Sequence, residues 1–452
     1  MIKLLSQIKA FLVKPRGLRG RPPKKRRKRE RGSVAITAVI IAIVITVMIT
    51  NQFGTSTSVD IIAAANYRDQ MRSHFLARSA QNLGELVIQL QRRIDNIKQL
   101  RGSVQITDFA DQILLAFCGN PEEVQAAIGF SGIKGLGADI GTCGINGGIR
   151  TEDDKINMNC ANGGDATAAT LKSELDALVY FPAYDAVFEE ADAEGWRRDR
   201  ATQVAALIDY IDNNGLRVRE RGTQEDYGYE SLRDPYKAKN TYIDSVGELK
   251  LVRGVDDRFW TLFGSAFTAY GGCKVNLAAL SNSQLIAGIL YLTAKNPNDP
   301  ILLNPQRLFA LAGLIAKARQ FGESFTKLED FVAFVKDPGA SVGQLATQSG
   351  TLAGSAAGAA VAQGVPGLNG GDKLGLELDI NKLRQVATVG PRRTYRVEAW
   401  GEIERKQQTK EGTPVFPPIR STITGVWDTK VTPQNVRKQP TPNGAWVFLR
   451  EE

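Results

Sequence analysis

The stretch Arg31-Gly32-Ser33-Val34-Ala35-Ile36-Thr37-Ala38 opens an apolar segment of this chain. No charged residue occurs from 32 to 59, and Val34 to Ile49 consists largely of isoleucine, valine and alanine. About 20 consecutive apolar residues in a helix span the hydrocarbon core of a bilayer. The segment therefore predicts one membrane-spanning helix that begins directly after Gly32. A signal anchor, which also places basic residues before an apolar helix, is the alternative at this point.

The basic charge of the chain is concentrated in front of this helix. Residues 1–32 contain 13 of the 57 lysines and arginines and one acidic residue, Glu30. Subtraction from the totals of 57 basic and 48 acidic residues leaves 44 and 47 in residues 33–452, a net charge of −3 against +9 for the whole chain. Basic residues beside a membrane helix mark its cytoplasmic side and attract anionic lipids. The distribution argues against a nucleic-acid-binding protein and predicts a body on the opposite side of the membrane.

Beyond the membrane segment the apolar residues keep a helical spacing. Between Ile61 and Leu90 they recur at intervals of three and four residues, and no proline interrupts the chain from Pro23 until Pro121. This pattern predicts that the helix continues to about residue 97 with an amphipathic second half.

The remainder of the chain changes its periodicity from helix to strand. Helical patterns dominate 155–337, and the capping box Ser281-Asn282-Ser283-Gln284 predicts one helix with Ser281 as its N-cap. Residues 339–371 carry no charge and are rich in glycine, alanine and serine, which predicts a flexible linker over 338–372. After the linker, alternating patterns predict antiparallel strands at Thr394–Glu404, Arg420–Trp427 and Ala445–Leu449.

Cysteine and histidine usage restricts the chemistry that the chain can perform. The cysteines are Cys118, Cys143, Cys160 and Cys273. Four cysteines allow three pairings, and the sequence does not choose among them. There is no CxxC pair and only one histidine, His74, so neither a zinc-ligand set nor a Ser-His-Asp or Cys-His arrangement is available. We therefore expect a protein that is not an enzyme.

A basic leader, a single glycine and an apolar helix from the next residue resemble the start of type IV prepilins and pseudopilins. The resemblance implies cleavage between Gly32 and Ser33 by a prepilin peptidase, followed by N-methylation of Ser33. It implies an α+β fold in which the long N-terminal helix packs on an antiparallel sheet and a large all-helical domain is inserted. The leader is longer than most in this class.

These expectations divide the chain into seven parts. They are the basic leader 1–32, the transmembrane half of the helix 33–53, its amphipathic half 54–97, the glycine-rich start of the head 98–154, the helical insertion 155–337, the linker 338–372 and the C-terminal strands 373–452.

Five further segments resemble the K class of minor pseudopilins in type II secretion (general secretion pathway protein K). They are Lys155-Ile156-Asn157-Met158-Asn159, Leu207-Ile208-Asp209-Tyr210-Ile211-Asp212, Tyr236-Lys237-Ala238-Lys239-Asn240, Asp244-Ser245-Val246-Gly247-Glu248-Leu249-Lys250-Leu251-Val252-Arg253-Gly254 and Lys274-Val275-Asn276-Leu277. The last departs from the pattern, because Ala278 replaces the second asparagine. Most pilins carry glutamate at the fifth mature position, which is Thr37 here. In lacking this glutamate the chain resembles the K class, and the resemblance implies a place at the filament tip.

The resemblance implies a minor pseudopilin that initiates and caps the type II secretion pseudopilus, for export of folded proteins across the outer membrane. Expected partners are the I, J and H classes of minor pseudopilins, the prepilin peptidase and the inner-membrane assembly platform, with the secretin and secreted substrates as further candidates. The expected location is the bacterial inner membrane, crossed once, with the C-terminal body in the periplasm. The alternatives are a minor pilin of a type IV pilus and a signal-anchored periplasmic binding module.

An acidic turn in the insertion gives a candidate calcium site. Asp212-Asn213-Asn214-Gly215 begins like a calcium loop, and family members can bind calcium in the insertion. EF-hand spacing is absent, because no glutamate stands at the twelfth position of a loop opened by Asp212. The candidate ligands are Asp212, Asn214, Glu225 and Asp226. The alternative is a solvated acidic turn, and no other cofactor is expected.

Overall fold

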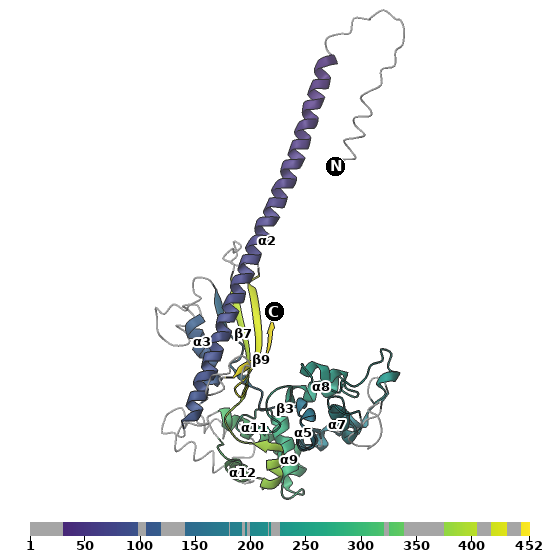
Figure 1. The fold of residues 1–452 in the computed structure, drawn as a ribbon, viewed down its shortest axis with the longest axis vertical. Helices are drawn as coiled ribbons and strands as arrows, with labels where there is room; N and C mark the ends of the chain where they lie inside the picture. Colours follow the sequence, from purple (N-terminus) through teal and green to yellow (C-terminus); the bar gives the residue numbers. More distant parts are fainter. Residues whose placement is uncertain are drawn as a thin grey trace, which may run out of the picture. The chain divides into compact units, whose positions relative to one another are not determined.

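The computed structural model describes most of the chain from residue 30 onward (Figure 1). The described ranges are 30–97, 105–118, 141–179, 181–191, 195–196, 199–215, 217, 227–320, 325–338, 375–404, 417–431 and 444–452, with the backbone alone for 30–33. The leader up to residue 29 and the linker from residue 339 lie outside these ranges. The chain divides into two compact units, Met1–Arg68 and Asp69–Glu452, which we describe separately.

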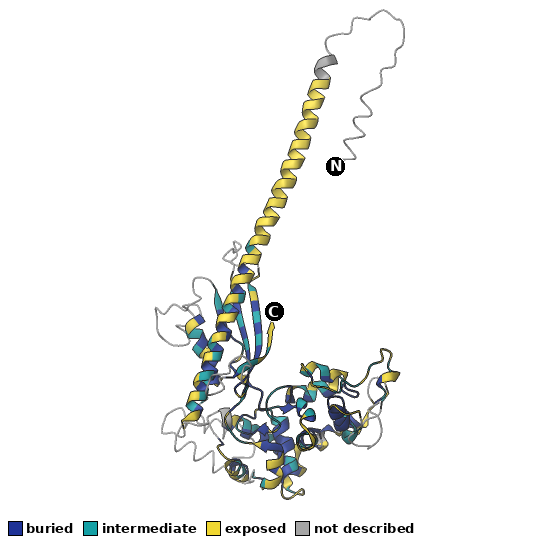
Figure 2. Cartoon of the chain, in the orientation of Figure 1, coloured by how far each residue is buried: buried dark blue, intermediate teal, exposed yellow. Residues whose placement is uncertain are grey.

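A single helix, α2 (Glu30–Asn96), contains both halves of the predicted N-terminal helix. It begins three residues before Ser33, so Gly32 does not interrupt it; one glycine costs a helix only about 1 kcal/mol. Among the described residues it is the one helix that is long and apolar enough to cross a membrane. All its side chains from 34 to 64 are exposed (Figure 2). Thr46 and Thr50 donate to the carbonyls of Ala42 and Thr46, each at 2.8 Å, which satisfies these hydroxyls inside the helix.

The second unit contains an antiparallel sheet. Its strands are β1 (Thr142–Ile145), β2 (Arg150–Thr151), β7 (Thr394–Ile403), β8 (Ile419–Asp428) and β9 (Ala445–Glu451). The order is β1-β7-β8-β9, and β2 also pairs with β7. The three long strands confirm the strands predicted near the C-terminus. The short strands β1 and β2 were missed in the glycine-rich segment, since two to four residues give almost no periodic signal.

The C-terminal part of α2 packs on one face of this sheet. Gly401 in β7 allows a close approach, because a Cβ there would lie 2.2 Å from the Ser73 carbonyl oxygen and 2.5 Å from the Ala77 nitrogen. The Ser73 and Ser421 hydroxyls meet at 2.6 Å in the same contact. The helix α3 (Ala110–Cys118) packs against β1 and completes this core. Its main members are Val87, Ile88, Leu114, Ile145, Tyr395, Val397 and Trp427.

A second core belongs to the helical segment that the chain forms between β2 and β7. Its α-helices up to residue 336 are α5 (Asp165–Val179), α6 (Asp185–Glu189), α7 (Arg200–Asp209), α8 (Asp257–Phe263), α9 (Ser283–Thr293), α10 (Pro300–Leu303), α11 (Pro305–Gln320) and α12 (Leu328–Lys336). The chain therefore leaves the sheet after Thr151 and returns at Thr394, so these helices are an insertion in the sheet.

Two pairs of very short parallel strands also belong to the insertion. β3 (Ile156–Asn157) pairs with β4 (Phe267–Thr268), and β5 (Val275–Asn276) pairs with β6 (Ala387–Thr388). The insertion is thus mainly but not entirely helical. Its C-terminal boundary also differs from the prediction, because α15 (Ile380–Val386) lies where strands were expected and buries Leu383 in the helical core. Seven residues are too short for a reliable helical period.

The start of α9 differs from the predicted capping box by one residue. The N-cap is Asn282, whose side chain accepts hydrogen bonds from the amides of Gln284 and Leu285. Ser281 instead donates from Oγ to Asp154 Oδ2 at 2.7 Å. Asparagine and serine are comparable N-caps, so the tertiary contact with Asp154 decides between them.

Candidate functional site: the helix start and the inserted domain

The predicted processing site lies in the first turns of α2. Gly32 and Ser33 are helical in backbone, and Thr37 is an exposed residue one turn later. Cleavage at Gly32 and methylation of Ser33 stay predictions.

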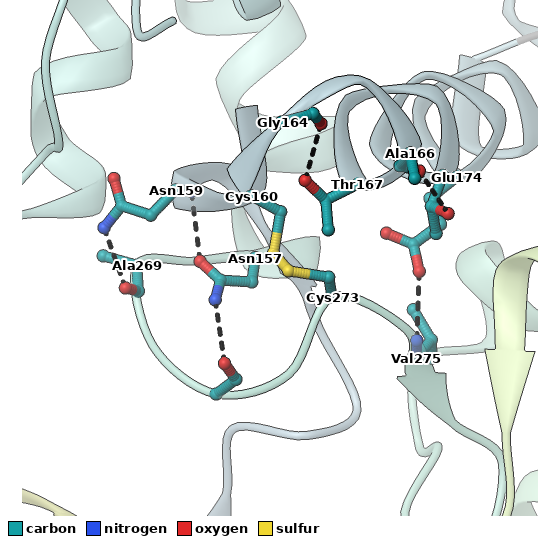
Figure 3. The surroundings of a disulfide bond; sticks show 12 residues. Asn157, Asn159, Cys160, Gly164, Ala166, Thr167, Glu174, Ala269, Cys273 and Val275 are labelled. Atoms are coloured by element: carbon teal, nitrogen blue, oxygen red, sulfur yellow. Dashed lines mark hydrogen bonds between the residues drawn. A yellow bond between two sulfur atoms is a disulfide. The ribbon is translucent and has the colours of Figure 1, made fainter. Parts of the chain in front are cut away.

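The segment Lys155–Asn159, called the first asparagine segment below, ties the start of the insertion to later parts of the chain (Figure 3). Asn157, at the end of β3, accepts a hydrogen bond from the Asn159 amide at 3.1 Å and donates to the Gly271 carbonyl at 3.1 Å. Asn159 donates to the carbonyls of Ile243 and Ala269 and accepts from the Ile243 amide at 2.8 Å. The two side chains therefore join three stretches of chain that are distant in sequence.

The segment Lys274–Leu277, called the second asparagine segment, makes the same kind of hydrogen bonds as the first. Asn276, at the end of β5, accepts from the Ala278 amide at 3.1 Å and donates to the Gly390 carbonyl at 2.9 Å. Ala278 stands where the first segment has Asn159, so the second segment lacks the additional contacts. The insertion thus contains two segments with the same arrangement. Each segment begins with a Lys-(Ile/Val)-Asn strand and ends with a later strand that pairs with the first strand in parallel.

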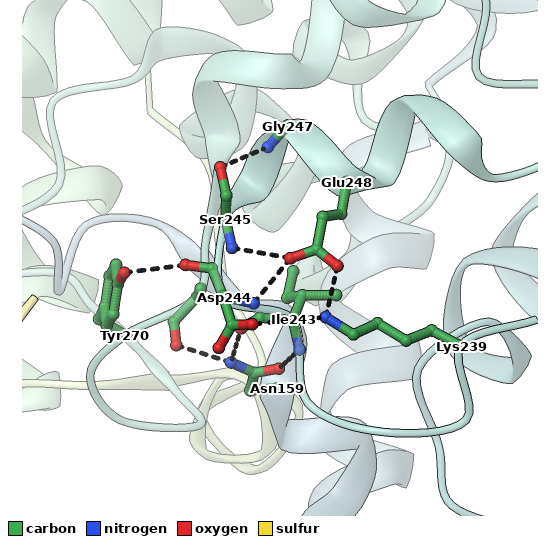
Figure 4. Close-up of polar contacts among 9 residues, drawn as sticks. Asn159, Lys239, Ile243, Asp244, Ser245, Gly247, Glu248 and Tyr270 are labelled. Carbon is green, nitrogen blue, oxygen red and sulfur yellow. Dashed lines mark hydrogen bonds and ion pairs between the residues drawn. The ribbon is translucent and has the colours of Figure 1, made fainter.

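The loop around Ile243, which Asn159 contacts, contains further hydrogen bonds and an ion pair (Figure 4). Ser245 caps the 3-10 helix η5 (Val246–Leu251), and Glu248 accepts from the amides of Asp244 and Ser245 at 2.8 and 3.0 Å. Lys239 forms an ion pair with the same carboxylate. Burial alone would raise the pKa of Glu248, but hydrogen bonds from Lys239 and from the two amides hold its pKa below the usual value. Glu248 is therefore a structural residue of the loop.

Three consecutive acids fill the joint where the insertion leaves the sheet. Glu152 is paired with Lys155 and Arg396 and accepts from Thr268 Oγ1 at 2.6 Å. Asp153 accepts from the amides of Arg393 and Thr394. Asp154 accepts from Ser281, as described above.

Beside these acids, Arg392 forms a bidentate pair with Asp108, and Arg393 a bidentate pair with Asp428 at 2.8 and 2.7 Å. The acids and arginines fix both crossing points of the chain between sheet and insertion.

The pKa values of these acids are shifted in different directions. For Glu152, burial raises the pKa, but Lys155 and Arg396 outweigh it and leave the pKa below the usual value. For Asp153 and Asp154, burial dominates and raises the pKa of each. Burial also raises the pKa of Glu174 well above the usual value; this α5 side chain accepts from the Val275 amide at 3.0 Å. The joint and the insertion thus hold acids with opposite pH responses.

The four cysteines form two disulfides, which resolves the pairing that the sequence left open. Cys118 pairs with Cys143 and ties α3 to β1. Cys160 pairs with Cys273 and ties the first asparagine segment to the loop before β5 (Figure 3).

The candidate calcium turn is described only in part. Glu225 and Asp226 lie outside the described residues, and the described ranges hold no group of three or more acidic, histidine or cysteine side chains placed to bind a metal. Asp212 is buried, and Asn214 donates to its Oδ2 at 2.8 Å.

Two buried amide oxygens near this turn, of Asn162 and Asn240, have no hydrogen-bond partner among the described residues. Their amide nitrogens donate to the carbonyls of Ile211 and Asn214, so both side chains flank the turn. Oxygen atoms of this kind suit calcium, which takes six to eight. Neither asparagine is among the four calcium ligands predicted from the sequence, and calcium binding stays a prediction.

The family comparison matches the first of these two segments of the insertion. Residues 156–270, 115 of the 452, match the family described as "Type II secretion system (T2SS), protein K". This segment of the chain is therefore similar to that family. The match begins at β3 and ends just after β4, so the parallel strand pair bounds the segment that is similar to protein K.

The comparisons with curated proteins and with solved structures add no closer relative. No curated protein matches the chain. Among solved structures, a chain in the crystal structure of the GspK-GspI-GspJ complex from the type 2 secretion system of enterotoxigenic Escherichia coli is similar at 13% identity. The alignment covers 87% of this chain and 99% of that chain, with a TM-score of 0.46.

Proposed function

We propose that this protein is a minor pseudopilin of the K class at the tip of the type II secretion pseudopilus, where it initiates and caps assembly for export of folded proteins across the outer membrane. The observation that carries the proposal is the combination of the protein K segment at 156–270 with a helix that starts apolar and ends packed on an antiparallel sheet. The role is architectural, and we propose no catalytic step.

The precursor is anchored once in the inner membrane with its body in the periplasm. The apolar part of α2 is long enough to cross a bilayer, and the basic residues lie before it. Two disulfides in the body agree with an oxidising compartment.

Thr37 supports placement at the tip. A glutamate at this position in a filament would sit among apolar helices, where an unpaired charge is costly. It would be tolerated because it neutralises the N-terminal ammonium of a neighbouring subunit. A tip subunit has no subunit above it, so threonine costs it nothing.

The partners we propose are the I, J and H classes of minor pseudopilins, the prepilin peptidase and the inner-membrane assembly platform. The inserted domain is the candidate surface for the secretin or for secreted substrates. The exposed side chains of α2 from 34 to 64 support packing against other apolar helices. The protein K segment favours this assembly over a type IV pilus and over a signal-anchored binding module.

The deciding experiment is the mature N-terminus, measured by intact mass and N-terminal peptide mapping in cells with and without a prepilin peptidase. We expect a chain that begins at methylated Ser33 only when the peptidase is present. A chain that keeps residues 1–32 under both conditions would refute the pseudopilin role and leave a membrane-anchored helical module.

A further inference from the structure

Strand β9 is the last strand of the sheet, with β8 on one side and no strand on the other among the residues that the structure describes. Just after β9, the amide and the carbonyl of Glu452 both bond to Thr422 of β8, each at 2.8 Å. Along an antiparallel strand, residues that bond to the neighbouring strand alternate with residues that do not. Arg450 therefore bonds to β8, whereas the N–H and C=O groups of Leu449 and Glu451 point away from the sheet.

The end of this edge is open to a further strand. Exposed edges are commonly protected by proline, by charges or by a bulge. β9 contains no proline. Arg450 forms an ion pair with Glu452, and Glu451 forms one with Arg78 of α2 at 2.8 Å, so these charges are already paired. The bulge lies at Val447, before the two residues whose backbone groups point outward.

A cleft of about 250 Å³ lies beside the same strand. Side chains alternate along a strand, so Phe448 and Arg450 point to the face opposite the one on which Glu451 meets α2. These two residues line the cleft from β9, and Tyr270 lines it from the insertion, together with the loop 244–246 (Figure 4). Ligand pockets usually measure about 300–1,000 Å³. The cleft is therefore of a size for one side chain.

The charged groups around this cleft are paired within the chain. Arg396 forms an ion pair with Glu152. Asp244 forms one with Lys239 at 3.7 Å. The two charged residues at the end of β9 pair with each other. An ionic ligand would have to displace these partners, whereas the two aromatic walls, whose ring centroids are 6.0 Å apart, favour a third ring.

We propose that β9 binds an extended segment of another protein, which adds as a further strand and places one aromatic side chain in the cleft beside Phe448 and Tyr270. Only an extended backbone matches outward groups that recur at every second residue. Side chains on one face of neighbouring strands lie about 5 Å apart, so an aromatic residue opposite Phe448 or Arg450 reaches the cleft. The inference does not depend on the proposed function, because it rests on β9 and the cleft alone.

The test measures binding of a fluorescent peptide to the full chain in detergent, by fluorescence anisotropy. The probe is a capped peptide of about seven residues in which valine and tyrosine alternate. Two control peptides carry N-methyl groups, one on every valine nitrogen and the other on every tyrosine nitrogen. We expect one of them to bind about tenfold more weakly than the probe and the other to bind equally well, because only alternate residues of an added strand face β9.

Two variants of the chain test the edge and its side chains. Leu449→Pro should weaken binding of the probe about tenfold, because it removes an outward N–H and no bond to β8. The matched variant Leu449→Thr keeps this N–H and should bind as the parent does. Tyr270→Ala should weaken binding of the probe but not of a peptide with serine in place of tyrosine. The methylated peptides are tested on the unaltered chain, so that result does not depend on the folding of a variant.

Equal affinity of the two methylated peptides would overturn the inference, because the backbone of the peptide would then not pair with β9. Binding of N-acetyltyrosine amide as tight as that of the probe would also overturn it, since the cleft would then be a site for a small aromatic compound. A serine peptide that binds as well as the probe would remove the role of the cleft and overturn the inference in the form stated.

Discussion

At the scale of single residues, a close helix crossing in the insertion depends on a glycine. A Cβ at Gly288, in α9, would lie 1.9 Å from the carbonyl oxygen of Ala177 in α5. The two helices can cross this closely only because the side chain is absent. Gly313, in the middle of α11, has no neighbour within 4 Å of the same position.

These two glycines give a matched pair of substitutions. Gly288→Ala should lower the stability of the full chain by about 1–3 kcal/mol, because the helices must separate or strain. Gly313→Ala should raise it by up to about 1 kcal/mol, because alanine favours the helix and meets no atom. Thermal unfolding in detergent, followed by circular dichroism, measures both. Equal melting temperatures for the two variants would contradict the close crossing.

Two buried glutamates should give opposite pH responses. Glu174 has a raised pKa, so its neutral form fits the fold, and stability is lost as the pH rises from the unfolded pKa near 4.5 through the folded pKa. Glu152 has a lowered pKa, so its stabilisation is present above the unfolded pKa and is lost as the pH falls through the folded pKa.

The variants Glu174→Gln and Glu152→Gln test these signs. Glu174→Gln should lose less stability than the parent as the pH rises above the usual glutamate pKa of 4.5, since no charge is forced into the core. Glu152→Gln should cost about 3–5 kcal/mol at neutral pH, because Lys155 and Arg396 lose their buried counter-charge, and less in acid. Denaturant unfolding at pH values from below the usual glutamate pKa of 4.5 to above neutral measures both, and parallel pH profiles would contradict the assignment.

At the scale of elements, the two disulfides close loops of different length. Cys118 and Cys143 are 25 residues apart, whereas Cys160 and Cys273 are 113 apart. A longer loop loses more conformational entropy in the unfolded chain when it is closed.

The double variant Cys160→Ala with Cys273→Ala should therefore be less stable than Cys118→Ala with Cys143→Ala by about 1 kcal/mol. Melting temperatures of the two full-length variants without reductant give the comparison. A reversed order would mean that native contacts around each bond outweigh loop entropy.

The turn after α7 is the element to examine for calcium. If Asp212 and the flanking asparagines hold the ion, adding calcium to chelator-treated protein should raise the melting temperature by a few degrees. Asp212→Ala should abolish this rise. Asp244→Ala should keep it, because that side chain is 98% exposed and belongs to the η5 loop. No shift in the parent would support the solvated acidic turn.

At the scale of the whole molecule, processing would reverse the sign of the net charge. The full chain carries +9 and has an isoelectric point near 9.3, whereas residues 33–452 carry −3. Removal of the leader should therefore move the isoelectric point from basic to below about pH 7. Isoelectric focusing with and without the prepilin peptidase detects this shift, and a form that stays basic would show that the leader is retained.

The long apolar N-terminal helix, the segments similar to protein K and the three long strands were predictable from the sequence, because each rests on many residues with one period or on a contiguous motif. Cleavage at Gly32 and the calcium ligands stay predictions.

Only the tertiary structure decided the rest. Pairing of Cys160 with Cys273, the parallel strands of two residues and the end of the insertion after Val386 depend on contacts between residues 100 or more positions apart. Asn159 is an example, because its side chain forms hydrogen bonds with the backbone of Ile243 and Ala269, which lie far from it in sequence. Local periodicity reports which face of an element is apolar, whereas the partner of that face is fixed by packing of the folded chain.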